Sequence, residues 1–134
     1  MTADAPVCRW TYRGIQVDLM ATDPAVLGFS NRWYGIAVQT ATRFSLRSGI
    51  VIQLISAPAF LATKFEDVVN VIGSRARIVE EVLAAPRELR EYLGAQCRQL
   101  VDNPDLENYL LGLLLDDSDL QHTDTVISRL RAIS

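Results

Sequence analysis

Residues 56–73 read SAPAFLATKFEDVVNVIG, and this stretch marks the change from strand-like to helix-like sequence. Ser56 can serve as an N-cap, and Pro58 falls in the first turn, where a missing N–H costs nothing. The stretch predicts one continuous helix that begins after Ser56 and ends with Gly73 as its C-cap. Its apolar residues recur at helical spacing and are expected to form the core face: Leu61, Phe65, Val68, Val69 and Ile72.

The sequence upstream of this helix alternates as β-strands do and predicts two antiparallel hairpins. The first occupies residues 7–20 and has its turn at 13–14. The second pairs 42–46 with 50–55 around a turn at 47–49, where a glycine can supply a positive φ. The second strand of the first hairpin places two sets of residues on opposite faces: Ile15, Val17 and Leu19 on one, Gln16, Asp18 and Met20 on the other.

The sequence downstream predicts four further helices: 75–84, 86–101, 104–115 and 120–133. Pro86 and Pro104 each stand at a helix start, a position that suits proline. Strands followed by helices are typical of an α+β domain. At 134 residues the chain is predicted to be a single domain, 1–134, with a strand-rich part at 1–56 and a helical bundle at 57–134.

Composition and charge exclude several classes of protein. The net charge of −3 is not that of a broadly basic nucleic-acid binder. The charge is uneven, with six basic and three acidic side chains up to Lys64, and seven basic and thirteen acidic from Phe65 onward. Because the apolar runs are too short to span a bilayer and no export signal follows Met1, we expect a cytoplasmic protein without membrane contact. Cys8 and Cys97 are then expected to be reduced thiols.

Three polar side chains are candidates for chemistry. Asp18 lies on a strand between apolar residues, where a carboxylate must reach the solvent edge or meet a cation. It is either a metal-holding carboxylate of the kind that phosphoryl transfer uses, or part of the wet face of a half-exposed sheet. Lys64 and Asp67 are three residues apart on the predicted helix. One interpretation is a surface ion pair. The other is that Lys64 binds a triphosphate and that Asp67 either orients the lysine or binds a metal ion.

Four stretches, taken in order, carry a resemblance to a known family. They are VDLM at 17–20, FSNRWY at 29–34, LISAP at 54–58 and FLATKFE at 60–66. Together they resemble bacterial nucleotidyltransferase-like proteins of the AbiEii/AbiGii toxin type, which belong to toxin–antitoxin systems and include the MenT toxins. The resemblance extends over nearly the whole chain. It implies a nucleotidyltransferase mixed sheet followed by a helical region, so that the two hairpins would be part of that sheet.

The resemblance also implies an activity, the metal-dependent transfer of a nucleotide from an NTP, in MenT-type toxins onto the 3′ end of tRNA. Asp18 matches the later strand carboxylate and would hold Mg²⁺. Lys64 matches the helix lysine and would bind the NTP, and Asp67 matches the aspartate that follows that lysine. These three are therefore the candidate catalytic residues, and RNA would be the acceptor.

Two departures from the family pattern qualify that expectation. Upstream of Val7 the family has a Gly-Gly or Gly-Ser turn and an Asp-x-Asp strand, whereas here only residues 1–6 precede it. Relatives also carry a longer insertion with arginine and glycine between the lysine and the aspartate, whereas Lys64 and Asp67 are expected here on one continuous helix. The expected protein is a truncated nucleotidyltransferase-fold protein that is catalytically incomplete on its own.

Two alternatives remain open. The chain could be half of a split nucleotidyltransferase, with a second polypeptide supplying the missing strand. It could instead be a non-enzymatic interaction module that binds a protein or dimerises. In the split enzyme the exposed sheet edge would be the docking surface, whereas the interaction module would bind through its acidic helices. A homodimer through the exposed sheet edge is the default expectation.

Overall fold

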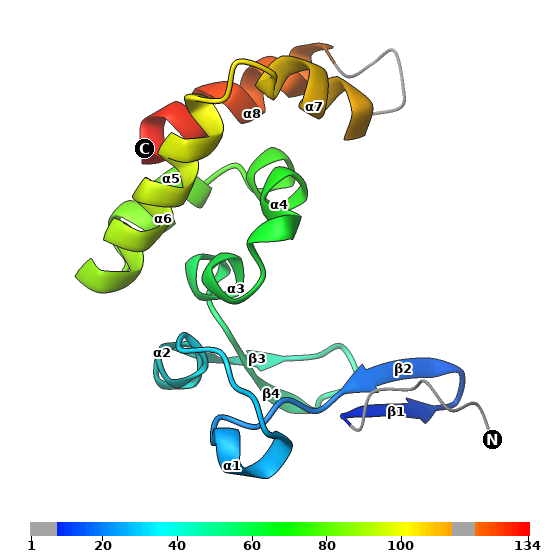
Figure 1. Cartoon of the computed structure of the whole chain (residues 1–134). Coiled ribbons are helices and arrows are strands. Elements are labelled where there is room, and N and C mark those ends of the chain that lie inside the picture. Colours follow the sequence, from blue (N-terminus) through cyan, green and yellow to red (C-terminus); the bar gives the residue numbers. More distant parts are fainter. Residues whose placement is uncertain (1–7, 114–119) are drawn as a thin grey trace, which may run out of the picture.

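The computed structural model describes residues 8–113 and 120–134. It confirms an α+β chain in which a strand-rich part, with two short helices between its hairpins, precedes a helical part (Figure 1). The strand-rich part contains β1 (Arg9–Tyr12), β2 (Ile15–Asp18), α1 (Pro24–Leu27), α2 (Tyr34–Gln39), β3 (Thr42–Ser45) and β4 (Val51–Leu54). The helical part contains α3 (Ala57–Thr63), η1 (Phe65–Asp67), α4 (Val68–Ser74), α5 (Ile78–Leu83), α6 (Arg87–Val101), α7 (Leu106–Leu113) and α8 (Leu120–Ile133).

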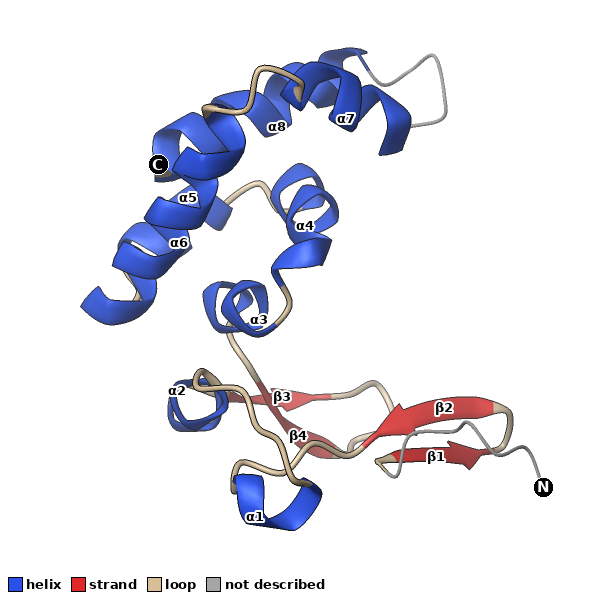
Figure 2. Ribbon diagram, viewed as in Figure 1, coloured by secondary structure: helices blue, strands red, loops and turns tan. Residues whose placement is uncertain are grey.

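The two predicted hairpins are confirmed, and each is a separate two-stranded antiparallel sheet (Figure 2). The first turns at Arg13 and Gly14, which both have positive φ, 49° and 81°, as a two-residue hairpin turn requires. Gly49 supplies the positive φ, 83°, in the turn of the second. Among the described residues no strands pair in parallel, so the single mixed sheet implied by the resemblance stays a prediction.

The continuous helix predicted after Ser56 is wrong, although its start is confirmed. The Ser56 hydroxyl accepts a hydrogen bond from the backbone N–H of Ala59 at 3.3 Å, as an N-cap should. The helix then ends at Thr63. Lys64 leaves the helical conformation, with φ −146° and ψ 69°, and a short 3₁₀ turn leads into α4.

The cause of this break lies outside the segment. A continuing helix would pair the Thr63 carbonyl with the N–H of Asp67. That carbonyl instead accepts a hydrogen bond from the Asn31 side chain at 3.3 Å. The Asp67 N–H donates to the carbonyl of Lys64 at 3.2 Å. A contact from 32 residues upstream therefore stabilises the end of α3.

The predicted C-cap at Gly73 is also wrong, because α4 continues to Ser74. A Cβ at Gly73 would overlap the His122 imidazole of α8, so the glycine allows close approach of the two helices. The cap of α4 comes from Arg129 of α8. Its Nη1 donates to the carbonyls of Ile72, at 2.6 Å, of Gly73, at 3.0 Å, and of Arg75, at 3.3 Å.

Replacing Gly73 by alanine should lower the free energy of unfolding by about 1–2 kcal/mol, because the added methyl group displaces His122 from a packed contact. Gly112→Ala is the matched control, since Gly112 is also helical but a Cβ there would meet open space. That substitution should be neutral or stabilising. Chemical denaturation would measure both. A Gly73→Ala variant that is more stable than the wild type would contradict this contact. So would a Gly73→Ala/His122→Ala double variant that recovers none of the lost free energy of unfolding.

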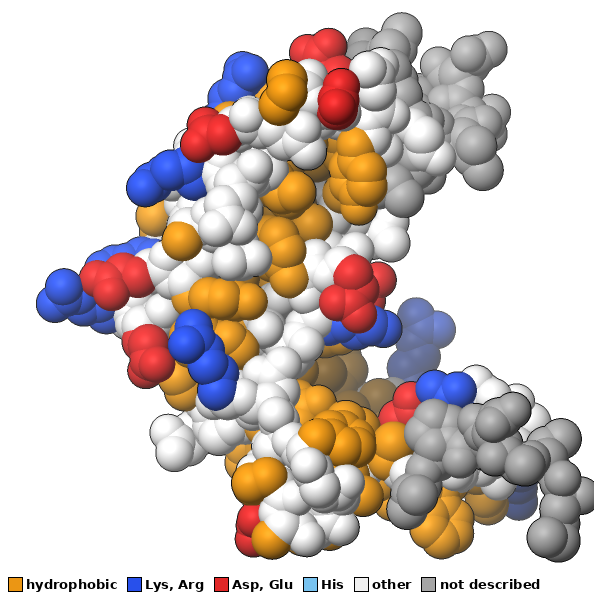
Figure 3. All heavy atoms as spheres, viewed as in Figure 1, with side chains coloured by type: hydrophobic (Ala, Val, Ile, Leu, Met, Phe, Trp, Pro, Cys, Tyr) orange, Lys and Arg blue, Asp and Glu red, His pale blue; other side chains and the backbone are white. Residues whose placement is uncertain are grey.

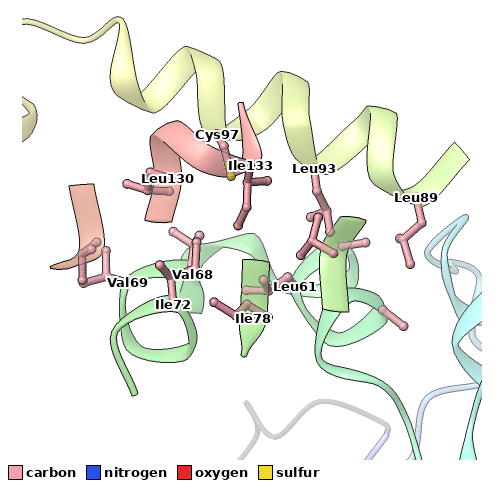
Figure 4. Packing of buried hydrophobic residues seen from close by; sticks show 14 of the residues in the cluster. Leu61, Val68, Val69, Ile72, Ile78, Leu89, Leu93, Cys97, Leu130 and Ile133 are labelled. Carbon is pink, nitrogen blue, oxygen red and sulfur yellow. The ribbon is translucent and has the colours of Figure 1, made fainter. Parts of the chain in front are cut away.

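The hydrophobic core belongs mainly to the helices. Buried side chains of α6 point from one side of the helix toward α8, α3 and α5 (Figure 4). The predicted core positions of the 56–73 stretch are confirmed, with Phe65 packed at the margin and the others buried: Leu61, Val68, Val69 and Ile72. Of the described residues before Ser56, the buried apolar side chains are Cys8, Trp33 and Ala37.

The strand-rich part is apolar but largely uncovered. Beyond Leu54, the large apolar side chains exposed in the described residues are only Leu83 and Tyr109, whereas the two hairpins and their connections expose many. Figure 3 shows hydrophobic side chains gathered over this part of the molecule. The hairpins therefore position polar residues beside the helices without forming a core of their own.

Candidate functional site

The first hairpin places Asp18 opposite Arg9. The two residues are a cross-strand pair, and the guanidinium donates from Nε and Nη2 to the two carboxylate oxygens at 2.8 and 2.9 Å. These hydrogen bonds are the main cause that holds the Asp18 pKa below its usual value. The charges of Arg9 and Lys64 lower this pKa further, against an opposing effect of desolvation. The cation that Asp18 meets in the described residues is therefore an arginine.

The break after α3 places Lys64 beside Asp67. The Lys64 Nζ lies 3.3 Å from an Asp67 carboxylate oxygen, with the lysine side chain 54% exposed and that of the aspartate 34%. The predicted neighbour relation holds, but it arises from a 3₁₀ turn rather than from a continuous α-helix. An exposed pair of this kind contributes little to stability.

The structure pairs two of the three predicted residues, Lys64 and Asp67, and pairs the third, Asp18, with Arg9. Lys64 pairs with Asp67, and its charge acts on Asp18, which is distant in the sequence. The hydrogen bond from Asn31 to the Thr63 carbonyl fixes the chain immediately before Lys64. We name Arg9, Asp18, Lys64 and Asp67 the charged corner. Its two cations and two carboxylates balance.

Sequence reasoning missed Arg9. The sequence contained the information, because a two-residue turn at 13–14 fixes the register of the hairpin. Residues whose numbers add up to 27 then face each other across the two strands. That register places Arg9 opposite Asp18, as observed. The aspartate is therefore explained locally by its cross-strand partner, and any ligand at Asp18 must compete with the guanidinium.

The charged corner does not fit a magnesium ion by itself. Mg²⁺ requires near-octahedral oxygen ligands, and protein sites usually hold it with one or two carboxylates together with substrate phosphates. Both carboxylates here are engaged by cations. Within residues 8–113 and 120–134, no group of three histidine, cysteine or acidic side chains could hold a metal ion. An exposed lysine ammonium, by contrast, can contact an anionic phosphate without further protein ligands.

Two hollows border the strand-rich part. An open groove of about 800 Å³ runs between the second hairpin, α3 and the end of α5, lined among others by Leu54, Phe60 and Ala84. An apolar hollow of about 380 Å³ lies between the first hairpin and α1. Neither of the two is lined by Asp18, Lys64 or Asp67.

The aromatic side chains divide into two kinds. Trp33 is buried and packs on Tyr92 with ring centroids 4.7 Å apart. Arg32 lies over both rings, at 4.4 and 5.1 Å from the centroids, so this cluster joins α2 to α6. Trp10 and Tyr12 are instead exposed, at 63% and 65%.

The comparisons with known proteins add no assignment. No family model, curated protein or solved structure matches the chain. In the part of the chain that the structure describes, no helix is long and apolar enough to cross a membrane.

Proposed function

We propose that this chain is a nucleotidyltransferase-like polypeptide that binds the phosphates of a nucleotide through Lys64 but cannot catalyse nucleotide transfer alone. The observation that carries the proposal is the exposed Lys64 ammonium beside Asp67, two of the residues that the family resemblance singles out. Its charge also helps to lower the pKa of Asp18, the third of those residues, although Asp18 lies on β2 and is distant in the sequence.

Lys64 is the member of the corner best suited to an anion. Its side chain is more than half exposed, and its partner Asp67 holds it through a single 3.3 Å contact. A polyphosphate carries more negative charge than one carboxylate and can displace it from the ammonium. Exchange of Asp67 for phosphate thus requires only a local rearrangement at the surface.

The incompleteness follows from the donor set. Metal-assisted phosphoryl transfer needs several oxygen ligands to neutralise the triphosphate and activate the attacking hydroxyl. Asp18 is the one strand carboxylate at the corner, and Arg9 already engages both of its oxygens. A second polypeptide that supplied further carboxylates would complete the site, which is the split-enzyme form of the same proposal.

A non-enzymatic interaction module is the second candidate. It is favoured by the exposed apolar side chains of the hairpins, which suit a protein contact rather than a phosphate. On this alternative the charged corner is a pair of surface ion pairs, and RNA and NTP have no role.

Nucleotide binding can be tested by the melting temperature of the purified chain with each NTP, with and without Mg²⁺. A nucleotide at about ten times its Kd should stabilise the fold by about 1.4 kcal/mol, a rise of a few degrees. Lys64→Met should abolish the rise. Arg87→Met is the matched control, because Arg87 is also an exposed cation in a helical ion pair, 2.6 Å from Glu91. It should leave the rise intact.

Asp18→Asn separates a metal ligand from a neighbouring charge. If Asp18 acts only by its charge beside Lys64, its removal should increase the nucleotide-induced rise measured without Mg²⁺. Loss of a magnesium-dependent rise in this variant would instead show a working metal site. Turnover of NTP by the pure chain would refute the proposal that the chain is catalytically incomplete. If no NTP raises the melting temperature, nucleotide binding is refuted and the interaction module becomes the favoured function.

A further inference from the structure

The first hairpin has one apolar face that no other described element covers. The register pairs Trp10 with Val17 and Tyr12 with Ile15, and residues directly opposite in an antiparallel pair point to the same side. The exposed fractions are 63%, 40%, 65% and 65% in that order. The alternate residues, which include Arg9 and Asp18, lie on the other side. We name Trp10, Tyr12, Ile15 and Val17 the hairpin face.

A two-stranded hairpin is marginal in water unless its apolar face packs against something. Beyond scattered contacts, β1 and β2 touch only each other among the described elements. In the part of the chain that the structure describes, this face is therefore open to contact with another molecule.

The hairpin face has the features of a self-complementary surface. Its tip carries Tyr12 and Ile15 beside the turn. Its base opens onto the apolar hollow of about 380 Å³, whose lining includes Cys8, Leu19 and Val26. A two-fold axis through the middle of the face would set the tip of each hairpin over the hollow of the other. Each copy thus offers both the protruding tip and the hollow that receives the tip of its partner, as an isologous interface requires.

The size and charge of this surface fit the same arrangement. Aromatic side chains offer roughly 150–250 Å² each, so the exposed fractions of the face and hollow correspond to roughly 700 Å², close to the roughly 800 Å² per partner of a standard interface. The four side chains of the face are uncharged, and the Arg13 guanidinium lies over the Tyr12 ring at the turn, at the edge of the face. A nucleic acid would need cations across the face itself.

We propose that a second copy of this chain packs on the hairpin face, with the two hairpins stacked face to face and the tip of each in the hollow of the other. This inference is independent of nucleotide binding. It differs from edge-to-edge strand pairing, because the contact is made by side chains rather than by backbone hydrogen bonds.

The test is the mass in solution, measured by light scattering and sedimentation over a wide concentration range. The wild-type chain should form a dimer of twice 14.9 kDa. Ile15→Glu places a charge in the face and should weaken self-association by about 100-fold or more. Gln16→Glu is the matched control, since it adds the same charge one residue later on the opposite side of β2 and should leave the dimer intact.

Tryptophan fluorescence gives a second readout that reports on the face directly. Trp10 should become shielded on association, so dilution of the wild type should shift its emission to longer wavelength, whereas Ile15→Glu should show the shifted emission at every concentration. The helical core is remote from β2, so helical circular dichroism should be equal in all three proteins and verifies folding. A wild type that stays monomeric, a dimer that both variants preserve, or a monomer that binds single-stranded RNA through Trp10 would overturn the proposal.

Discussion

Replacing Arg129 by methionine is expected to lower the free energy of unfolding by about 3–4 kcal/mol. Hydrogen bonds from charged donors contribute about 1.5–3 kcal/mol each, and one nitrogen here serves the carbonyls of Ile72, Gly73 and Arg75. The three are shared by one atom, so their contributions do not add fully. Methionine keeps the apolar stem and removes only the donors. Denaturant unfolding would measure the loss.

Arg131→Met is the control for that variant. Arg131 lies two residues further along α8, is exposed, and favours the helix C-terminus only through the helix dipole. Its replacement should lower the free energy of unfolding by less than about 1 kcal/mol. Equal losses in the two variants would mean that the contact to α4 adds nothing beyond a surface charge. Hydrogen exchange should also speed up in α4 when Arg129 is replaced, since the cap of that helix is removed.

The hairpins were predictable because their determinants are local. The turn at 13–14 fixes the register, and the alternation of Ile15 and Val17 with Gln16 and Asp18 fixes the faces. The same register would have given the Arg9–Asp18 pair. What the pattern cannot provide is whether an apolar face is covered, because that depends on elements and molecules far from the strand.

The errors in the 56–73 stretch share one physical cause. Helical periodicity continues through Lys64, and nothing local signals that Asn31 will engage the Thr63 carbonyl. Gly73 has the composition of a C-cap, but its role is to admit His122 from a helix about fifty residues away. Both features depend on tertiary contacts, which override local propensity.

In the candidate site, too, local features were predictable from the sequence and tertiary contacts were not. The pairing of Lys64 with Asp67 followed from their spacing, and it survives the change from α-helix to 3₁₀ turn. The effect of the Lys64 charge on the Asp18 pKa needed the fold, since it acts between the end of a hairpin and the end of a helix. The family resemblance named the same residues, and nucleotide-binding measurements on their variants test whether they act together.

The stability of the chain should fall steeply above pH 9 because of a single thiol. Burial in the core raises the pKa of Cys97 from 9.0 to about 12. Between these values the folded thiol keeps its proton and the unfolded thiol loses it. The contribution is therefore fully present below pH 9 and is lost as the pH rises, at about 1.4 kcal/mol per pH unit. Denaturant unfolding at a series of pH values would give this slope.

Cys97→Ala isolates the thiol from other groups that titrate in the same range. The variant should be less stable at neutral pH, since it leaves a small cavity among Leu93, Leu130 and Ile133. Its deficit relative to the wild type should shrink as the pH rises past 9, because only the wild type carries the buried thiol. Alkylation provides an independent measure, since native Cys97 should resist reagent at pH 8 and react at once on unfolding. A constant deficit across the pH range, together with rapid native alkylation, would show that Cys97 is neither buried nor shifted.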